Sequence, residues 1–173
     1  MIDCMPSPPT PEELDASPVW SLIRAAHMLE RHVTEVFGAH ALTPVQFGVL
    51  SYLAATGPMT TAELARSVLV RPQSIAGVIH TMSERGLVER PGPRGRGRSS
   101  PVHLSNAGEI LLAAVWPSFV QANAADALGL STEQAATLPD TMHRLMSRLA
   151  PHTSPKGTAA AVATGRGRHV ANG

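Results

Sequence analysis

The most constraining feature of the sequence is residues 60–104, which are typical of two short helices, a sharp turn and a basic loop between two strands. Thr60 is followed three residues later by Glu63, a pair whose side chains can cap the first turn of a helix. A second helix is predicted to begin at Pro72, where proline loses no hydrogen bond, and to end at Gly86. Apolar residues at helical spacing predict the buried faces, with Leu64, Ala65 and Val68 on the first helix and Ile75, Val78, Ile79 and Met82 on the second.

The opposite face of the second helix consists of polar or small residues. It carries Arg71, Gln73, Ser74, Gly77, His80, Thr81 and Glu84. Gln73 and Ser74 lie in the first turn, where the residues of a recognition helix reach base edges in the major groove. We therefore predict that this face contacts duplex DNA, with Arg71 holding a phosphate.

The segment after this helix has the pattern of a two-stranded wing. Residues 87–90 and 101–104 resemble strands, and between them lies a run of proline, glycine and arginine that includes Arg94, Arg96 and Arg98. Residues 71–98 contain six arginines against two glutamates, so this stretch carries +4 in a chain of net charge +1. Such a concentration of charge predicts a polyanionic partner, and we expect the three wing arginines to lie along or in the minor groove.

Several of these motifs are similar, in order and spacing, to those of MarR-type winged-helix regulators. They are Leu42-Thr43-Pro44-Val45-Gln46-Phe47, Glu63-Leu64-Ala65, Arg85-Gly86-Leu87-Val88-Glu89-Arg90 and Val102-His103-Leu104-Ser105-Asn106-Ala107-Gly108. The resemblance implies a mainly α fold with a small β-wing, in which a winged helix-turn-helix DNA-binding domain is joined to N- and C-terminal dimerisation helices. It also implies a homodimer that binds a pseudo-palindromic operator as a repressor.

The chain departs from the family pattern in two places. Family wings usually carry an acidic residue shortly before the tip arginine, and Arg96 stands at that position here. The recognition helix of the family is often capped by Ser, Thr or Asp, whereas Arg71 precedes Pro72 in this chain. A missing side-chain cap costs about 1 kcal/mol in isolation, and a bound phosphate could supply the absent acceptor.

Composition and helix signals predict one structured domain between two unstructured ends. The expected organisation is a disordered leader (1–16), a winged-helix domain (17–150) with its DNA-binding lobe at about 43–104 and dimerisation helices at about 17–38 and 105–150, and a disordered tail (151–173). The terminal helices carry more apolar surface than one chain can cover, which favours a homodimer.

The resemblance further implies a pocket for a small aromatic ligand, such as an aromatic acid. Trp20, His27, Met28 and Met82 are the candidates to line it, although each residue alone is more typical of a core or interface position.

Other functions find less support in the residues. The sequence has no phosphate-binding glycine loop and no nucleophile motif, so we predict neither an enzyme nor a cofactor. His27 and His32 lie on different faces of their helix, which argues against metal sensing. The resemblance implies that a redox-sensing cysteine would lie in the first helix, and Cys4, the only cysteine, lies well before that helix. The lack of a long apolar run predicts a cytoplasmic protein without a membrane span. The alternative is a winged-helix module that binds proteins rather than specific DNA, which the basic wing argues against.

Overall fold

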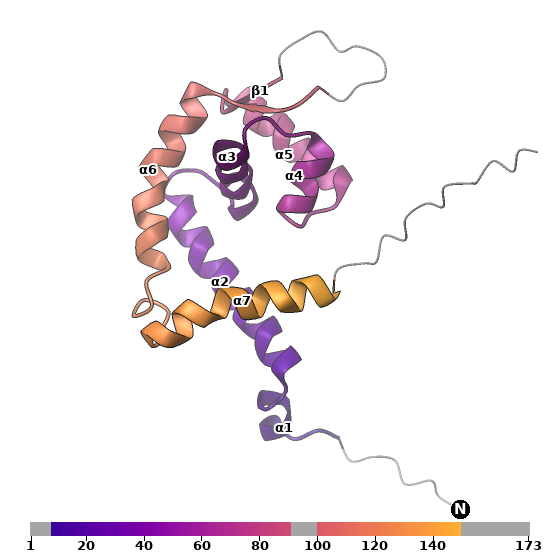
Figure 1. Ribbon diagram of the computed structural model, residues 1–173, viewed down its shortest axis with the longest axis vertical. Helices are drawn as coiled ribbons and strands as arrows, with labels where there is room; N and C mark the ends of the chain where they lie inside the picture. The colour runs from indigo at the N-terminus through magenta and orange to yellow at the C-terminus, as the bar shows by residue number, and fades with distance from the viewer. Residues whose placement is uncertain (1–7, 91–99, 150–173) are drawn as a thin grey trace, which may run out of the picture. The chain divides into compact units, whose positions relative to one another are not determined.

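The structure is a computed structural model that describes residues 8–90 and 100–149, and the chain divides into two compact units between Ser131 and Thr132 (Figure 1). The first unit contains α1 (Pro11–Asp15), α2 (Pro18–Gly38), α3 (Pro44–Thr56), α4 (Thr61–Ser67), α5 (Pro72–Glu84), β1 (Val88–Glu89), β2 (His103–Leu104) and α6 (Asn106–Ala122). The second unit contains α7 (Thr132–Leu149). This mainly helical architecture with a small sheet confirms the predicted fold class.

Short-range capping signals set the helix starts of the DNA-binding lobe. At the start of α3 the Thr43 hydroxyl accepts from the Gln46 N–H at 3.2 Å, and the Gln46 side chain accepts from the Thr43 N–H at 3.0 Å. Thr60 and Glu63 form the same reciprocal pair before α4, at 3.2 and 2.7 Å. Both pairs satisfy N–H groups that a helix leaves without partners, and the predicted cap at Thr60 is confirmed.

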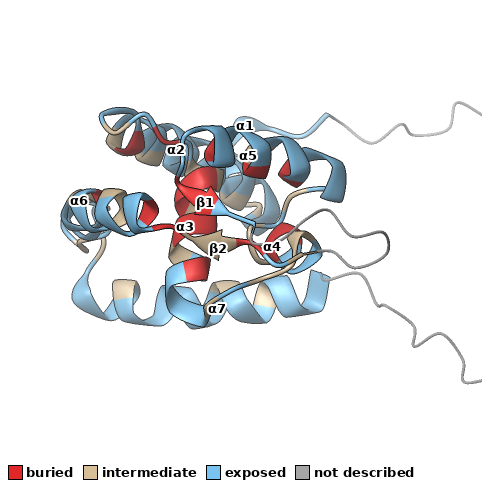
Figure 2. Cartoon of the chain, turned by 90° about the horizontal axis from the view of Figure 1, so that it is seen from above, coloured by how far each residue is buried: buried red, intermediate tan, exposed pale blue. Residues whose placement is uncertain are grey.

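The core of the first unit is built around α3. Figure 2 shows buried residues on α3 and on the elements beside it. The Phe37 and Phe47 rings stack with their centroids 4.3 Å apart, which joins α2 to α3. The predicted inward stripe of α5 is confirmed for Ile75, Ile79 and Met82, each at most 2% exposed.

The wing strands pair as predicted but are shorter. Val88 lies opposite Leu104, and Glu89 lies opposite His103, in an antiparallel ladder. Met59 adds an isolated bridge to Val102, with reciprocal hydrogen bonds of 3.1 and 2.7 Å. This third segment was not predicted, because a single bridging residue leaves no alternating pattern to detect.

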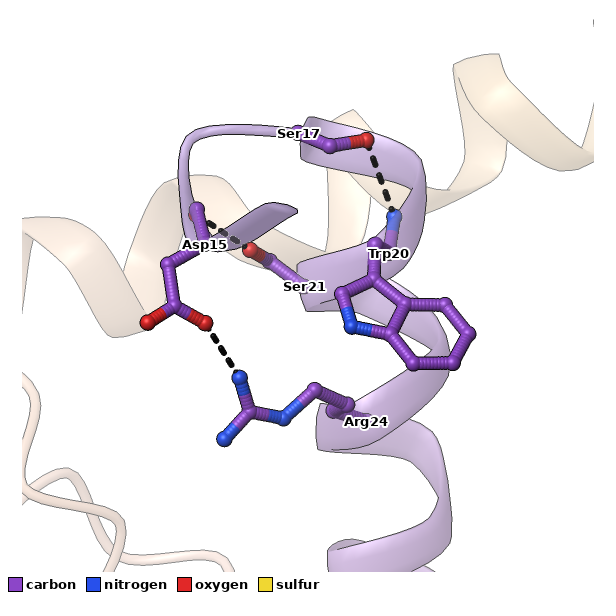
Figure 3. A network of polar contacts seen from close by, with 5 residues as sticks. All are labelled: Asp15, Ser17, Trp20, Ser21 and Arg24. Atoms are coloured by element: carbon purple, nitrogen blue, oxygen red, sulfur yellow. Dashed lines mark hydrogen bonds and ion pairs between the residues drawn. The ribbon is translucent and has the colours of Figure 1, made fainter. Parts of the chain in front are cut away.

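The predicted unstructured leader extended to residue 16, and this boundary is wrong for α1. Thr10 and Glu13 form a capping box there, with the Glu13 carboxylate accepting from the Thr10 N–H at 2.8 Å. Figure 3 shows how α1 is joined to α2: the Asp15 carboxylate pairs with Arg24, and the Ser21 hydroxyl donates to the Asp15 carbonyl at 2.9 Å. The capping signal was present in the sequence, but the surrounding prolines obscured it.

Both late helices continue through a proline. Pro117 lies inside α6 and Pro139 lies inside α7, where each lacks the N–H that would complete an intrahelical bond. Considered by itself, α7 has no buried residue, and Leu138, Met146 and Leu149 are 40–72% exposed. These apolar side chains of α7 therefore have no cover within its own unit.

The turn between α4 and α5 contains a strained residue, which leads to a stability prediction. Leu69 has a φ of +54° and is 77% exposed, so its side chain gains little packing in return for a left-handed backbone. We expect Leu69→Gly to raise the free energy of unfolding by about 1 kcal/mol, because glycine adopts this conformation without a Cβ clash.

Thermal unfolding of the DNA-free protein measures this change. The matched control is Ala76→Gly in the exposed middle of α5, which should lower stability by about 1 kcal/mol because glycine is a poor helix former. Destabilisation by both substitutions would show that the turn at Leu69 is not strained.

Candidate DNA-binding surface

A tight turn presents α5 across α4. The Val68 N–H donates to the Leu64 carbonyl at 3.0 Å, and the Val70 N–H donates to the Ala65 carbonyl at 3.0 Å, so these two carbonyl groups of α4 have partners in the turn before α5 begins. Leu64 and Ile75 are both completely buried and belong to the same core cluster. The two helices and their turn thus form a helix-turn-helix, with one face of α5 directed away from the core.

The outward face of α5 carries the residues that the sequence predicted for it. Arg71, Gln73, Ser74, Gly77, His80 and Thr81 are all exposed. The Thr81 hydroxyl donates to the Gly77 carbonyl at 3.1 Å, and the His80 ring lies 3.4 Å from the Glu84 carboxylate. Among the described residues, and apart from its chain neighbours and the adjoining backbone of α5, no atom lies within 4 Å of the position that a Cβ on Gly77 would take. The middle of this face is therefore open for close approach.

The first turn of α5 has no side-chain cap. Arg71 occupies the capping position without such a hydrogen bond, and Pro72 follows it. The N–H groups of this turn lie at the positive end of the helix dipole, which is a favourable place for a phosphate. The cationic side chain of Arg71 at the same end adds to this preference.

Two of the arginines counted in the basic stretch hold the scaffold together. Arg85 donates through Nη1 to the Ala41 carbonyl at 2.7 Å, which joins the end of α5 to the turn after α2. Arg90 donates through Nη2 to the Thr61 hydroxyl at 2.9 Å, which joins the end of the first wing strand to the start of α4. Their charges still add to the positive field, but their guanidinium groups are already engaged. Arg94, Arg96 and Arg98 lie outside the described residues.

Hydrogen bonds from Thr60, first from its N–H and then from its hydroxyl, hold the pKa of Glu63 below its usual value of 4.5. A lowered pKa in the folded state stabilises the protein fully above the usual value, and this contribution is lost as the pH falls through the lowered one. The cap that begins α4 is therefore complete at neutral pH.

The four residues predicted to line a ligand pocket are not brought together. Trp20 and Met28 are 43% and 70% exposed on α2, and the His27 ring lies 2.9 Å from the Ile23 carbonyl of the same helix. Met82 has no exposed surface and belongs to the core. A side chain enclosed on all sides cannot line an open pocket in this conformation, so the expectation for Met82 is corrected.

The structure instead places two apolar hollows along α3 and α6. They have volumes of about 480 and 440 Å³ and share Ala54, Leu112 and Trp116 as walls. Glu109 and Leu104 are among the other residues that line the first hollow, and Tyr52 is among those that line the second. Sequence reasoning missed Trp116 because a tryptophan within an apolar helix is equally typical of a core position.

Two other features of the described residues bear on function. Among the helices that the structure describes, none is both long enough and apolar enough to cross a membrane. Within the same residues, histidine, cysteine, aspartate and glutamate do not gather in any group of three that could hold a metal ion.

Sequence comparison relates this chain to known regulators. The profile of the MarR family matches residues 41–99. The HTH-type transcriptional repressor Rv2887 of Mycobacterium tuberculosis is 32% identical over 97 residues, which cover 56% of this chain and 70% of the repressor. The HTH-type transcriptional repressor NicR of Pseudomonas putida is 32% identical over 117 residues, which cover 63% of this chain and 73% of that protein.

Solved structures have the same fold. A probable transcriptional regulator from Pseudomonas aeruginosa superposes with a TM-score of 0.64 at 30% identity, covering 76% of this chain and 98% of its own. Rv2887 in complex with DNA superposes with a TM-score of 0.62 at 25% identity, covering 76% and 98%. Rv2887 has also been solved with salicylic acid, with a TM-score of 0.60 at 27% identity and coverage of 76% and 97%. The chain has a helix-turn-helix and wing strands and is similar in sequence to these regulators. It therefore belongs to the MarR family of winged helix-turn-helix transcriptional regulators.

Proposed function

We propose that this protein is a sequence-specific DNA-binding repressor that acts as a homodimer and is released from DNA by a small molecule. The observation that carries the proposal is the exposed polar face of α5, held outward by the helix-turn-helix. Support comes from Rv2887, a repressor whose structure includes a complex with DNA. The protein is then cytoplasmic and acts by binding rather than by catalysis.

The residues of α5 and of the wing contact different parts of the DNA. Gln73 and Ser74 read base edges in the major groove, because they lie in the first turn of the recognition helix. Arg71 holds a phosphate at the helix end, and the exposed Gly77, His80 and Thr81 complete the surface that approaches the groove. Arg94, Arg96 and Arg98 of the wing lie along or in the adjacent minor groove.

Uncovered apolar side chains on the terminal helices support the homodimer. Val19 and Ile23 on α2, Ile110 and Val120 on α6, and Leu149 on α7 are between 42% and 72% exposed. Soluble proteins seldom leave so much apolar surface in water. Residues 17–38 and 105–150 would pair two copies, and residues 43–104 of each copy would bind one half-site of a pseudo-palindrome about 34 Å from the other.

The hollows beside Trp116 support control by a small aromatic molecule. They are mainly apolar, and the second is also lined by Ser51, whose buried hydroxyl has no hydrogen-bond partner in the described chain. A buried hydroxyl without a partner is costly, and a bound ligand could satisfy it. Such a ligand releases DNA only if it binds the DNA-incompetent dimer more tightly, in which case DNA weakens ligand binding by the same factor.

The assigned roles predict different effects for two substitutions. Gln73→Ala should weaken binding to the operator by about 1–3 kcal/mol and leave binding to random duplex nearly unchanged, because a base contact is lost. Arg71→Ala should weaken binding to both duplexes, because a phosphate contact is independent of sequence. Fluorescence anisotropy with DNA from upstream of the protein's own gene and with a shuffled duplex measures both effects.

Arg31→Ala is the matched control, since Arg31 is an exposed arginine on α2 outside this surface. Equal losses on both duplexes for Gln73→Ala would remove its role in base reading. Binding that does not distinguish the upstream duplex from the shuffled one would instead favour a winged-helix module for protein interaction.

A further inference from the structure

We infer that the hollows beside Trp116 select small aromatic ammonium compounds over aromatic acids of the same shape. This inference rests on the proposed function in treating a small molecule as the occupant. It differs from the sequence-based expectation of an aromatic acid and from the salicylic acid found with Rv2887.

The walls of the site are apolar and partly aromatic. Ala54 of α3 and Leu112 of α6 line both hollows, and Trp116 lies between them with 48% of its surface exposed. Behind the indole, the Phe119 and Phe47 rings lie with centroids 5.5 and 6.3 Å away, so aromatic packing supports its inner side. A flat apolar ring fits beside an indole held in this way.

The charge of the lining is negative. Glu109 carries the only formal charge among the described residues that line the first hollow, and none of the described residues that line the second is charged. Among the described residues, neither lining supplies an arginine, lysine or histidine to pair with a carboxylate. An aromatic acid would therefore bring a second negative charge toward Glu109 without a cation between them.

Two amides at the helix start beside Glu109 already have partners within the chain and are not free for a carboxylate. The Ser105 hydroxyl accepts from the Gly108 N–H at 3.0 Å, and the Ser105 carbonyl accepts from the Glu109 N–H at 2.9 Å. An ammonium group finds the reverse situation, since a carboxylate and the face of an indole both attract cations. Glu109 together with Trp116 thus favours a cationic head on an aromatic body.

Three probes that share a phenyl ring test this preference: phenethylamine, 2-phenylethanol and phenylacetate. In full-length protein with Trp20→Phe, Trp116 is the only tryptophan, so its fluorescence reports binding at the hollows directly. We expect the amine to bind about three- to fivefold more tightly than phenylacetate, the ratio of one partly exposed ion pair. This ratio should shrink as salt is added, because ions screen exposed charges.

Substitutions at Glu109 separate charge selection from simple apolar binding. Glu109→Gln should bring the amine and the acid to equal affinity while leaving 2-phenylethanol unchanged, and Glu109→Lys should invert the order. Glu30→Gln on α2 is the control and should keep the preference for the amine. The inference would be overturned if phenylacetate bound as tightly as the amine. It would also be overturned if no probe changed the fluorescence of Trp116, as is expected when a second copy of the chain covers the hollows.

A DNA-binding assay distinguishes a failure of the charge selection at the hollows from a failure of the proposed repressor function. The same Trp20→Phe protein is assayed for binding to the upstream duplex in the absence of any probe. Specific DNA binding without a preference for the amine would refute the charge selection alone. A preference for the amine without specific DNA binding would refute the repressor function alone.

Discussion

DNA binding by this protein is expected to weaken by about a thousandfold or more between about 50 and 200 mM salt, as for proteins that make six or more phosphate contacts. Each phosphate neutralised by an arginine releases condensed counterions, and added salt opposes that release. A dimer offers two copies of the arginines in residues 71–98. Fluorescence anisotropy titrations of the upstream duplex at several salt concentrations give the slope of log affinity against log salt.

The shuffled duplex and one variant complete this measurement. The shuffled duplex should show a similar slope, because its phosphates are the same, and Arg71→Ala should reduce the slope by about one for each contact removed. A flat dependence for the unmodified protein would contradict a binding surface built on arginine and phosphate.

Gly108→Ala is expected to lower the free energy of unfolding by about 3 kcal/mol, the upper part of the usual range for overpacking a core. A Cβ at Gly108 would lie 2.3 Å from the Leu87 carbonyl oxygen and 2.7 Å from Cδ1 of Leu104. The Leu87 carbonyl is fixed in place, because it accepts a hydrogen bond from the Ser105 N–H at 3.2 Å. The added methyl would therefore push α6 away from the base of the wing. Urea unfolding measures the loss.

Gly38→Ala provides the control for this substitution. Gly38 is the last residue of α2. Among the described residues, and apart from its chain neighbours and the adjoining backbone of α2, no atom lies within 4 Å of the place its Cβ would take. Alanine there should be neutral, or stabilising by less than about 1 kcal/mol through its higher helix propensity. Similar stability changes at the two sites would show that the close approach at Gly108 is relieved at little cost.

The sequence by itself determined the local elements of this protein. The starts of α4 and α5 were predicted because each signal lies within four residues, at Thr60 and Glu63 or at Pro72. The start of α3, at Thr43 and Gln46, has a signal of the same short range. The exposed polar face of α5 was equally predictable, because helical periodicity separates it from Ile75 and Ile79. Helix α1 carried the same kind of signal at Thr10 and could have been found.

The tertiary structure alone decided which distant residues meet. It brought Met59 to Val102, engaged Arg85 with the carbonyl of Ala41, and pressed Gly108 against Leu87. These contacts depend on how the helices pack against one another, and the hydrophobic periodicity of a single sequence does not predict that packing.

The candidate sites show the same division. Predicting the exposed face of α5 required only the periodicity of one helix. Predicting the lining of the hollows would have required knowing how α3 packs against α6. A methionine at helical spacing is apolar whether it lines a pocket or fills a core, and only packing placed Met82 in the core and left Trp116 at the surface. The chemical character of each side chain could be taken from the sequence, but its burial could not. Burial depends on residues distant in the sequence that pack around the side chain only in the folded protein.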